Sequence, residues 1–362
     1  HVLRRRQRQM CIRDSDSTAT TGTGRNTAIG SSALASITTG QQNVAIGTSA
    51  GSTVTSTSNT VLIGHNVGLA INSTGAGGTV AIGYQAGKAI TSAGYNTVIG
   101  YSAMQGITTG HSNTVIGYGA MDDTDAGSTS SDSDHNIAIG VNAMGGTWAN
   151  SLSQNNIAIG NNSLDGALDG AYYNIALGHY VFSNLTTGDA NIGIGWAALE
   201  SMTTGATNIA IGKQAMQVHT TGQYNITIGH GAMDDTDAGS TSLGSQHNIF
   251  IGLDAGGGTW ADVASNQNVA IGNYSMDGAL DGAGNNVAIG YQVGSALTTA
   301  DHNVMIGSQA GENATTGGYS VIIGKDAGRY HYTANQNVLI GYSAGEYLSL
   351  IHISEPTRLS LI

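Results

Sequence analysis

The sequence predicts an all-β protein that folds as a parallel β-roll, or β-solenoid, of about 18 coils. The motif Asn-x-x-Ile-Gly recurs along the chain, and most copies are about 17 residues apart. A fixed period of roughly 20 residues is typical of a solenoid, in which each repeat is one coil stacked on the previous one. No window shows a sustained helical apolar period, so helices are not expected.

A short β-strand is expected directly before each motif glycine, which we number position 0. Position −1 is Ile in seventeen copies, as in Ile46 and Ile271, and position −3 is Val or Ile in fifteen. Residues two apart share one face of a strand, and β-branched side chains suit a packed sheet surface. We therefore expect positions −1 and −3 to form the core face. Position −2 is mostly Ala and is expected on the second face.

The other recurrent positions of the repeat predict how the coils are joined. Position −4 is Asn in fifteen copies, as in Asn43 and Asn268, and stacked Asn side chains can hydrogen-bond from coil to coil. The glycine, as in Gly47 and Gly272, lets the chain turn. A second extended stretch, often ending in Thr-Thr-Gly, follows. We therefore expect two strands and two turns in each coil.

Both ends of the chain resemble translated adapter DNA from a transposase-based sequencing library. The resemblance covers residues 5–15 and 348–358. Segments of this kind are set aside in fold reasoning. We therefore expect residues 1–15 to be an adapter-derived, disordered artefact, residues 16–347 to be a single β-solenoid, and residues 348–362 to be adapter-derived. The solenoid itself is then expected to be a metagenomic fragment of a longer protein.

The solenoid segment is strongly acidic. The whole chain has a formal charge of −12, and without the two ends 5 basic and 21 acidic residues remain, a charge of −16. Such a surface disfavours nucleic acid and anionic membranes as partners. Cys11 is the only cysteine and lies in an end segment, so no disulfide framework is expected. No apolar run approaches the roughly 20 residues that span a bilayer, so no membrane insertion is expected.

A longer, 112-residue period lies over the short one. From Gly117 to Gly229, and again from Gly229 to Gly341, the intervals between motif glycines run 23, 20, 18, 17, 17 and 17, which indicates a duplicated six-coil unit. The longest coil of each unit carries an acidic segment, and the next carries Trp148 or Trp260. Insertions in a solenoid form surface loops, often on the binding face.

These irregular coils supply the candidate surface-binding residues, Trp148, Trp260, Asp122 and Asp234. An indole beside acidic and small polar side chains can bind a sugar or a host polymer. The alternative is that each indole covers its own loop.

The acidic segments also contain weak calcium candidates, Asp123, Asp125, Asp235 and Asp237. Calcium takes six to eight oxygen ligands, and the closing Glu of a twelve-residue calcium loop is missing here. A solvated loop is therefore favoured, and no metal site or cofactor is expected. No Ser/His/Asp set or carboxylate pair recurs at a fixed place in the repeat, so no catalytic residues and no enzyme activity are expected.

The repeat resembles the head repeat of trimeric autotransporter adhesins, in Asn43-Val-Ala-Ile-Gly-Thr-Ser-Ala50 and Asn268-Val-Ala-Ile-Gly-Asn-Tyr-Ser275. The longer form with Thr-Thr-Gly, residues 38–51, also resembles repeats of bacteriophage tail fibres. The resemblance covers residues 24–347. It implies a left-handed parallel β-roll, a homotrimer, an extracellular location on a cell surface or virion, and attachment to a host-surface glycan or protein. The coils here are longer than those of the adhesin family, and the choice between the two sources stays open.

An ice-binding solenoid is the alternative function, because rows of Thr on a flat β face can order water. The Thr pairs are interrupted by the two longest kinds of coil. The main expectation is therefore a structural and adhesive fibre segment.

Overall fold

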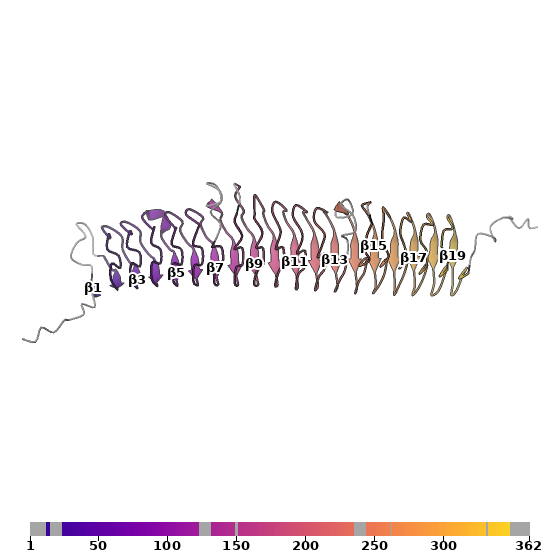
Figure 1. Cartoon of the computed structure of the whole chain (residues 1–362), viewed down its shortest axis with the longest axis horizontal. Helices are drawn as coiled ribbons and strands as arrows, with labels where there is room; N and C mark the ends of the chain where they lie inside the picture. Colours follow the sequence, from indigo (N-terminus) through magenta and orange to yellow (C-terminus); the bar gives the residue numbers. More distant parts are fainter. Residues whose placement is uncertain are drawn as a thin grey trace, which may run out of the picture. The chain divides into compact units, whose positions relative to one another are not determined.

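The computed structural model confirms an all-β solenoid, and it describes residues 12–14, 24–122, 132–148, 151–234, 244–261, 263–330 and 332–347. Within these residues, 18 parallel strands of three residues each precede the 18 motif glycines (Figure 1). The chain divides into two compact units, 1–187 and 188–362, and each is described by itself.

The first unit contains a terminal strand and nine coil strands. They are β1 (Ile12–Asp14), β2 (Thr27–Ile29), β3 (Val44–Ile46), β4 (Val61–Ile63), β5 (Val80–Ile82), β6 (Thr97–Ile99), β7 (Thr114–Ile116), β8 (Ile137–Ile139), β9 (Ile157–Ile159) and β10 (Ile175–Leu177). β1 pairs antiparallel with β2, and the other neighbours pair in parallel.

The second unit contains nine further parallel strands. They are β11 (Ile192–Ile194), β12 (Ile209–Ile211), β13 (Ile226–Ile228), β14 (Ile249–Ile251), β15 (Val269–Ile271), β16 (Val287–Ile289), β17 (Val304–Ile306), β18 (Val321–Ile323) and β19 (Val338–Ile340). Pairing is in strict register in both units, so that Ile209 lies beside Ile226 just as Val44 lies beside Val61. Each repeat position therefore forms a straight column along its unit.

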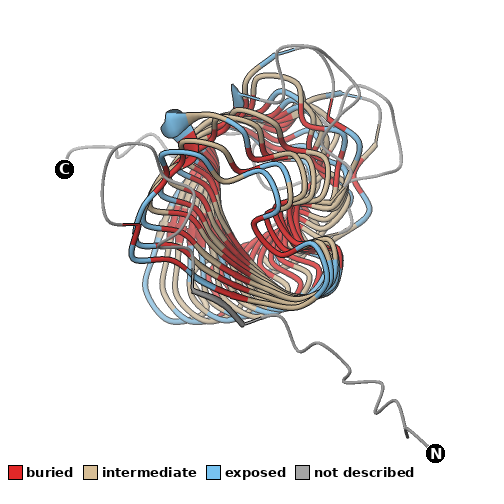
Figure 2. Cartoon of the chain, turned by 90° about the vertical axis from the view of Figure 1, so that its left-hand side faces the viewer, coloured by how far each residue is buried: buried red, intermediate tan, exposed pale blue. Residues whose placement is uncertain are grey.

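The predicted core face is wrong, because the strands are turned the other way. Position −2 is the buried position in nearly every strand, from Ala45 and Leu62 to Phe250 and Met305. Positions −3 and −1 are half-buried or exposed, as at Ile271, which is 37 % exposed. A two-residue period separates the two faces of a strand but does not say which one is inside. Figure 2 shows the buried positions recurring at the same places from coil to coil.

The core of each coil is completed by buried side chains at positions +3 and +4 and at +7 or +8. Size at position −2 is matched to size at position +4. Where the residue at −2 is large, as in Phe250 and Met305, the residue at +4 is glycine. A Cβ added to Gly256 would lie only 3.0 Å from the Phe250 ring. Where −2 is Ala, as in Ala176, position +4 is often large, as in Phe182. Close packing requires this compensation.

The Asn column forms the predicted ladder. The backbone N–H of Asn208 donates to Oδ1 of Asn191 at 2.9 Å, and the N–H of Asn225 donates to Oδ1 of Asn208 at 2.9 Å. Nδ2 of Asn208 also donates to the carbonyl of Gly222 at 2.8 Å. These Asn side chains are buried, so the ladder satisfies backbone groups that water cannot reach.

The motif glycines have the expected conformation and a further reason to be glycine. Gly212 has φ of +143°, a conformation that residues with a side chain rarely adopt. A Cβ at Gly212 would also lie 2.1 Å from the carbonyl oxygen of Gly229 in the next coil. The column therefore allows two coils to approach each other closely.

The expected second strand of each coil is absent from the described residues. The Thr-Thr-Gly stretch instead makes isolated coil-to-coil hydrogen bonds, such as that from the N–H of Thr203 to the carbonyl of Thr220 at 2.9 Å. A short 3-10 turn, η1 (Thr74–Ala76), lies between β4 and β5. No described helix is long and apolar enough to cross a membrane.

Candidate functional site

Three surface features of the described residues are candidates for function: the outer face of the strands, columns of aromatic rings beside that face, and a groove along the first unit.

The outer face of the strands carries two columns at positions −3 and −1 that are mostly Val and Ile, with Thr27, Thr97 and Thr114 at position −3 in the first unit. Ile159 is 40 % exposed in the first unit, and Ile228 is 37 % exposed in the second. Because the strands pair in register, these side chains form flat apolar rows. Contiguous exposed apolar surface of this kind marks interaction sites in soluble proteins.

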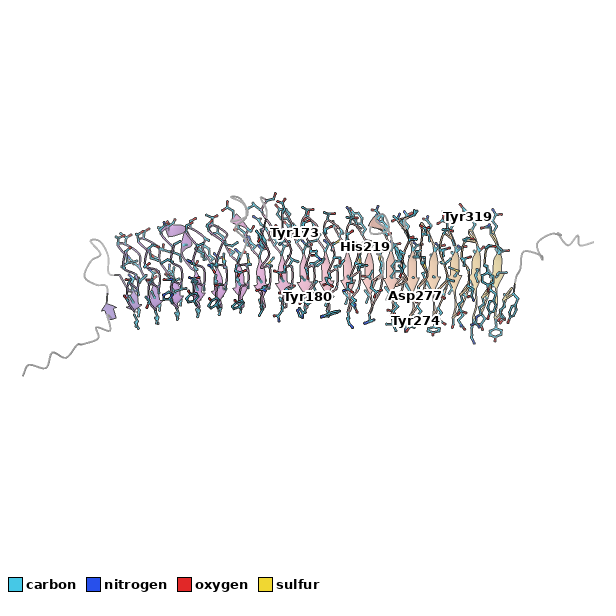
Figure 3. The ribbon with its side chains drawn as sticks, in the orientation of Figure 1. Tyr173, Tyr180, His219, Tyr274, Asp277 and Tyr319 are labelled. Carbon is cyan, nitrogen blue, oxygen red and sulfur yellow. The ribbon has the colours of Figure 1, made fainter. Side chains whose placement is uncertain are left out.

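Aromatic columns border this face. His65, Tyr84, Tyr101 and Tyr118 occupy position +1 of consecutive coils and stack with ring centroids 4.8–5.4 Å apart. Rings also occupy position −5, where Tyr319 stacks on His302 at 4.8 Å. In Figure 3, Tyr173 and Tyr180 lie on opposite edges of the strand row of the first unit, and Tyr319 and Tyr274 do so in the second. The aromatic borders widen the apolar face.

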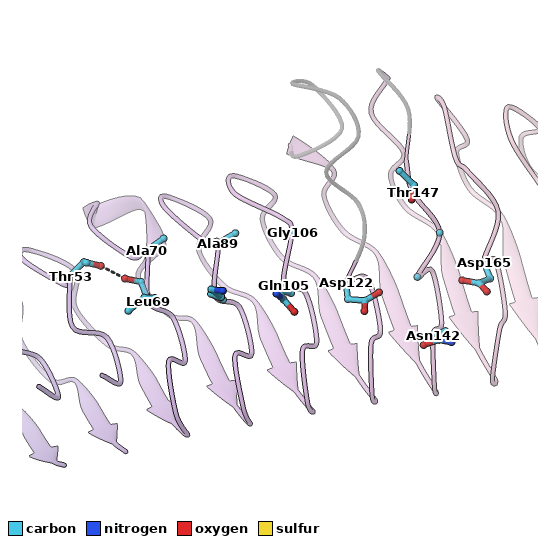
Figure 4. Close-up of a pocket in the computed structure, with 13 residues that line it drawn as sticks. Thr53, Leu69, Ala70, Ala89, Gln105, Gly106, Asp122, Asn142, Thr147 and Asp165 are labelled. Carbon is cyan, nitrogen blue, oxygen red and sulfur yellow. Dashed lines mark hydrogen bonds between the residues drawn. The ribbon is translucent and has the colours of Figure 1, made fainter. Parts of the chain in front are cut away.

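A groove of about 1080 Å³ lies on the first unit, along positions +5 and +6 of successive coils (Figure 4). Its apolar lining includes Leu69, Ala70 and Ala89. The charged and amide side chains that line it are Lys88, Gln105, Asp122, Asn142 and Asp165, and they are half-buried. Thr53 and Thr147 also line it. Such a volume is at the upper end of the range for ligand pockets.

A pair of carboxyl groups lies at one end of this groove. Burial and the nearby charge of Asp122 raise the pKa of Asp165 to about 6, although a hydrogen bond from the backbone of Gly145 acts in the opposite direction and lowers it. The equivalent residue in the second unit is Asp277, where burial and the charge of Asp254 raise the pKa to about 6. Both sites therefore favour a neutral or hydrogen-bonding partner for the half-buried carboxyl group over a second anion.

The surface role predicted for the two indoles is wrong. Trp148 and Trp260 are both fully buried, and Trp260 packs edge-to-face against Phe250 at 5.7 Å. They occupy position +8, where Leu168 and Leu280 fill the core in other coils. Asp122 and Asp234 are half-buried at position +5, and Asp122 lines the groove.

The weak calcium candidates Asp123, Asp125, Asp235 and Asp237 lie outside the described residues. Among the residues that are described, no group of three or more His, Cys, Asp or Glu side chains is placed to hold a metal ion. Lys88, Gln105, Asn142 and Asp165 were not among the residues predicted from the sequence. The signal that could have found them is their recurrence at position +5 or +2 across neighbouring coils.

Comparison with known proteins gives no further guide to function. No protein-family model matches the chain, and no curated protein matches its sequence.

Proposed function

We propose that this chain is a structural and adhesive fibre segment that self-associates as a homotrimer through its outer β face. The proposal places it outside the cell, on a bacterial surface or a virion tail fibre, where it attaches to a host glycan or protein without catalysis. The observation that carries the proposal is the pair of columns, mostly Val and Ile, on the outer face of β2–β10 and β11–β19.

Burial of these columns against further copies of the chain has a clear energetic benefit. Apolar surface removed from water contributes about 25 cal/mol per Å². The same face repeats in every coil, so a contact that stabilises one coil is available to its neighbours. A trimer with its copies side by side would cover the columns along each unit and leave the opposite surfaces open for attachment.

Sedimentation equilibrium of the purified chain tests the self-association. We expect a trimer for the unaltered protein and a shift towards monomer for the double variant Ile159→Asp/Ile271→Asp, whose two sites are both on the outer face. Val263→Asp is the matched control, because Val263 is 54 % exposed but lies outside the strands. A monomer at all concentrations for the unaltered chain would show that the outer face does not join copies.

Attachment is tested separately by binding of the fluorescently labelled chain to bacterial and animal cells. Binding to neither cell type would remove the adhesive part of the proposal and leave the structural part. For the ice-binding alternative, the Thr hydroxyl groups give no support, since Oγ1 of Thr203 and Thr298 donate to carbonyls of the next coil at 3.1 Å.

A further inference from the structure

We infer that the groove on the first unit binds a linear, neutral oligosaccharide that lies along the coil stack. The inference rests on the proposed attachment function and names the site and the ligand class for it. The charged and amide residues of the groove are Lys88, Gln105, Asp122, Asn142 and Asp165.

The groove is elongated in the direction of coil stacking. Lys88 follows β5 and Asp165 follows β9, so four coil steps separate them. With strands about 4.8 Å apart, this separation is about 19 Å along the stack. Figure 4 shows Gln105, Asp122 and Asp165 on different coils along one side of the unit. A ligand that reaches all of them is therefore a chain with repeating polar groups.

The side chains present both kinds of hydrogen-bonding group. Ammonium groups only donate, ionised carboxylates only accept, and amide side chains do both. Sugar hydroxyl groups donate and accept, so they can pair with every polar residue of this groove. The small apolar side chains of Ala70 and Ala89 also line the groove, and they leave room for the carbon face of a sugar ring.

Charge favours a neutral polymer over a charged one. Lys88 is cationic, while Asp122 and Asp165 are acidic. A polymer with charges of a single sign would therefore be repelled by residues of the same charge at one end of the groove. Among the described residues, no carboxylate forms an ion pair with the Lys88 ammonium group, which leaves it available to a ligand.

A peptide is the less favoured occupant. Extended peptides bind by adding a strand to a free sheet edge. In the groove, the N–H of Ala70 already donates to the carbonyl of Lys88 at 3.0 Å, and the Thr53 hydroxyl donates to the carbonyls of Leu69 and Ile71. These backbone groups are therefore already paired between coils.

The second unit provides an internal comparison. The equivalent residues lie 112 residues further along the chain. Lys88 is replaced by Glu200 and Gly106 by Val218, whereas Gln105 is conserved in type as Gln217. Oε2 of Glu200 accepts a hydrogen bond from Nε2 of Gln217 at 2.6 Å, so the two polar groups pair with each other. The equivalent surface of the second unit thus has an acidic residue in place of the Lys88 cation, and we assign binding to the first unit alone.

Isothermal titration calorimetry of the full chain tests the inference with cellohexaose, maltohexaose and N-acetylchitohexaose as probes. We expect one of the three to bind with one site per chain. Lys88→Glu and Asp122→Ala should each weaken that binding about tenfold, because each removes a hydrogen bond that involves a charged group. Lys213→Glu makes the same charge change outside the groove and should leave the affinity unchanged. Circular dichroism confirms that each variant folds.

The following outcomes would overturn the inference: binding of none of the three probes, equal weakening by Lys213→Glu, tighter binding of an oligogalacturonate of the same length, or binding only of an extended Ser-Gly peptide. If the chain attaches to cells but binds no probe, the groove assignment fails while the attachment function stands. If it does neither, both fail.

Discussion

The backbone nitrogen of Asn43 lies 3.0 Å from Oδ1 of Asn26, its counterpart one coil earlier. The same relationship recurs along each unit, so each Asn side chain satisfies a buried backbone N–H of the next coil. The Asn column therefore holds neighbouring coils together, and substitutions in it should lower the stability of the fold.

Asn208→Ala tests the column in the second unit. The substitution leaves the N–H of Asn225 and the carbonyl of Gly222 without the partners they have now. Because buried polar groups without partners are costly, we expect a loss of about 2–4 kcal/mol in the free energy of unfolding. Urea denaturation measures it. Gln246→Ala alters an exposed side chain nearby and should change stability by less than about 0.5 kcal/mol. Equal effects of the two variants would contradict this role of the Asn column.

Gly212→Ala tests the close approach of neighbouring coils. The added Cβ would meet the carbonyl oxygen of Gly229 at 2.1 Å, and the residue would keep an unfavourable φ of +143°. We expect a loss of about 3 kcal/mol or more, since the backbone must shift to relieve both problems. Thermal unfolding is the measurement. Gly244→Ala is the control, because its Cβ would meet only the Thr221 hydroxyl at 3.4 Å. A stable Gly212→Ala variant would show that the coils can separate locally.

The period of the motif was enough to predict the solenoid, the position of each strand and the Asn ladder. It was not enough to orient the strand, because Ile at −1 and Ala at −2 are both apolar. The feature that reveals which face points inward is the matching of side-chain size between positions −2 and +4, as where Phe250 at −2 faces Gly256 at +4. That relationship joins residues on opposite sides of a turn and becomes interpretable only when the coil path is known.

The groove was harder to predict than the fold. Its residues come from coils that are far apart in the sequence, from Thr53 to Asp165. Each is ordinary within its own repeat, and only the stacking of coils places them in one row. The surface role predicted for the two indoles was wrong for a different reason. The extra residues of an irregular coil can bury a Trp as well as expose it.

His219 predicts a pH dependence of stability in the second unit. It is fully buried at position +7, where Ile107 stands one long period earlier, and its Nε2 lies 3.0 Å from the carbonyl of Ser245. Burial lowers its pKa from 6.5 to about 4. As the pH falls below 6.5, the unfolded chain takes up a proton that the folded chain does not accept until about pH 4. The folded state therefore loses stability across this window, by about 3 kcal/mol in total.

His219→Ile isolates this contribution. We expect the variant to be more stable than the unaltered chain at pH 4.5, with a difference that shrinks towards neutral pH. Urea denaturation at pH 7, 6, 5 and 4.5 provides the measurement. Ile107→Val in the first unit is the control, because it changes packing at the equivalent position without adding or removing a titrating group. A constant difference across this pH range would mean that His219 does not titrate between the two states.

The two buried tryptophans, Trp148 and Trp260, occupy equivalent positions but differ in their hydrogen bonds. Nε1 of Trp260 donates to the carbonyl of Gly256 at 3.1 Å, whereas Nε1 of Trp148 is buried without a partner among the described residues. Replacement by Phe removes a hydrogen bond in one coil and an unsatisfied donor in the other. We expect Trp260→Phe to destabilise by about 1–2 kcal/mol more than Trp148→Phe, because only the first change leaves a carbonyl oxygen unpaired. Urea denaturation of both variants measures the difference. Equal losses would indicate that size alone, rather than the hydrogen bond, fixes the indole in these coils.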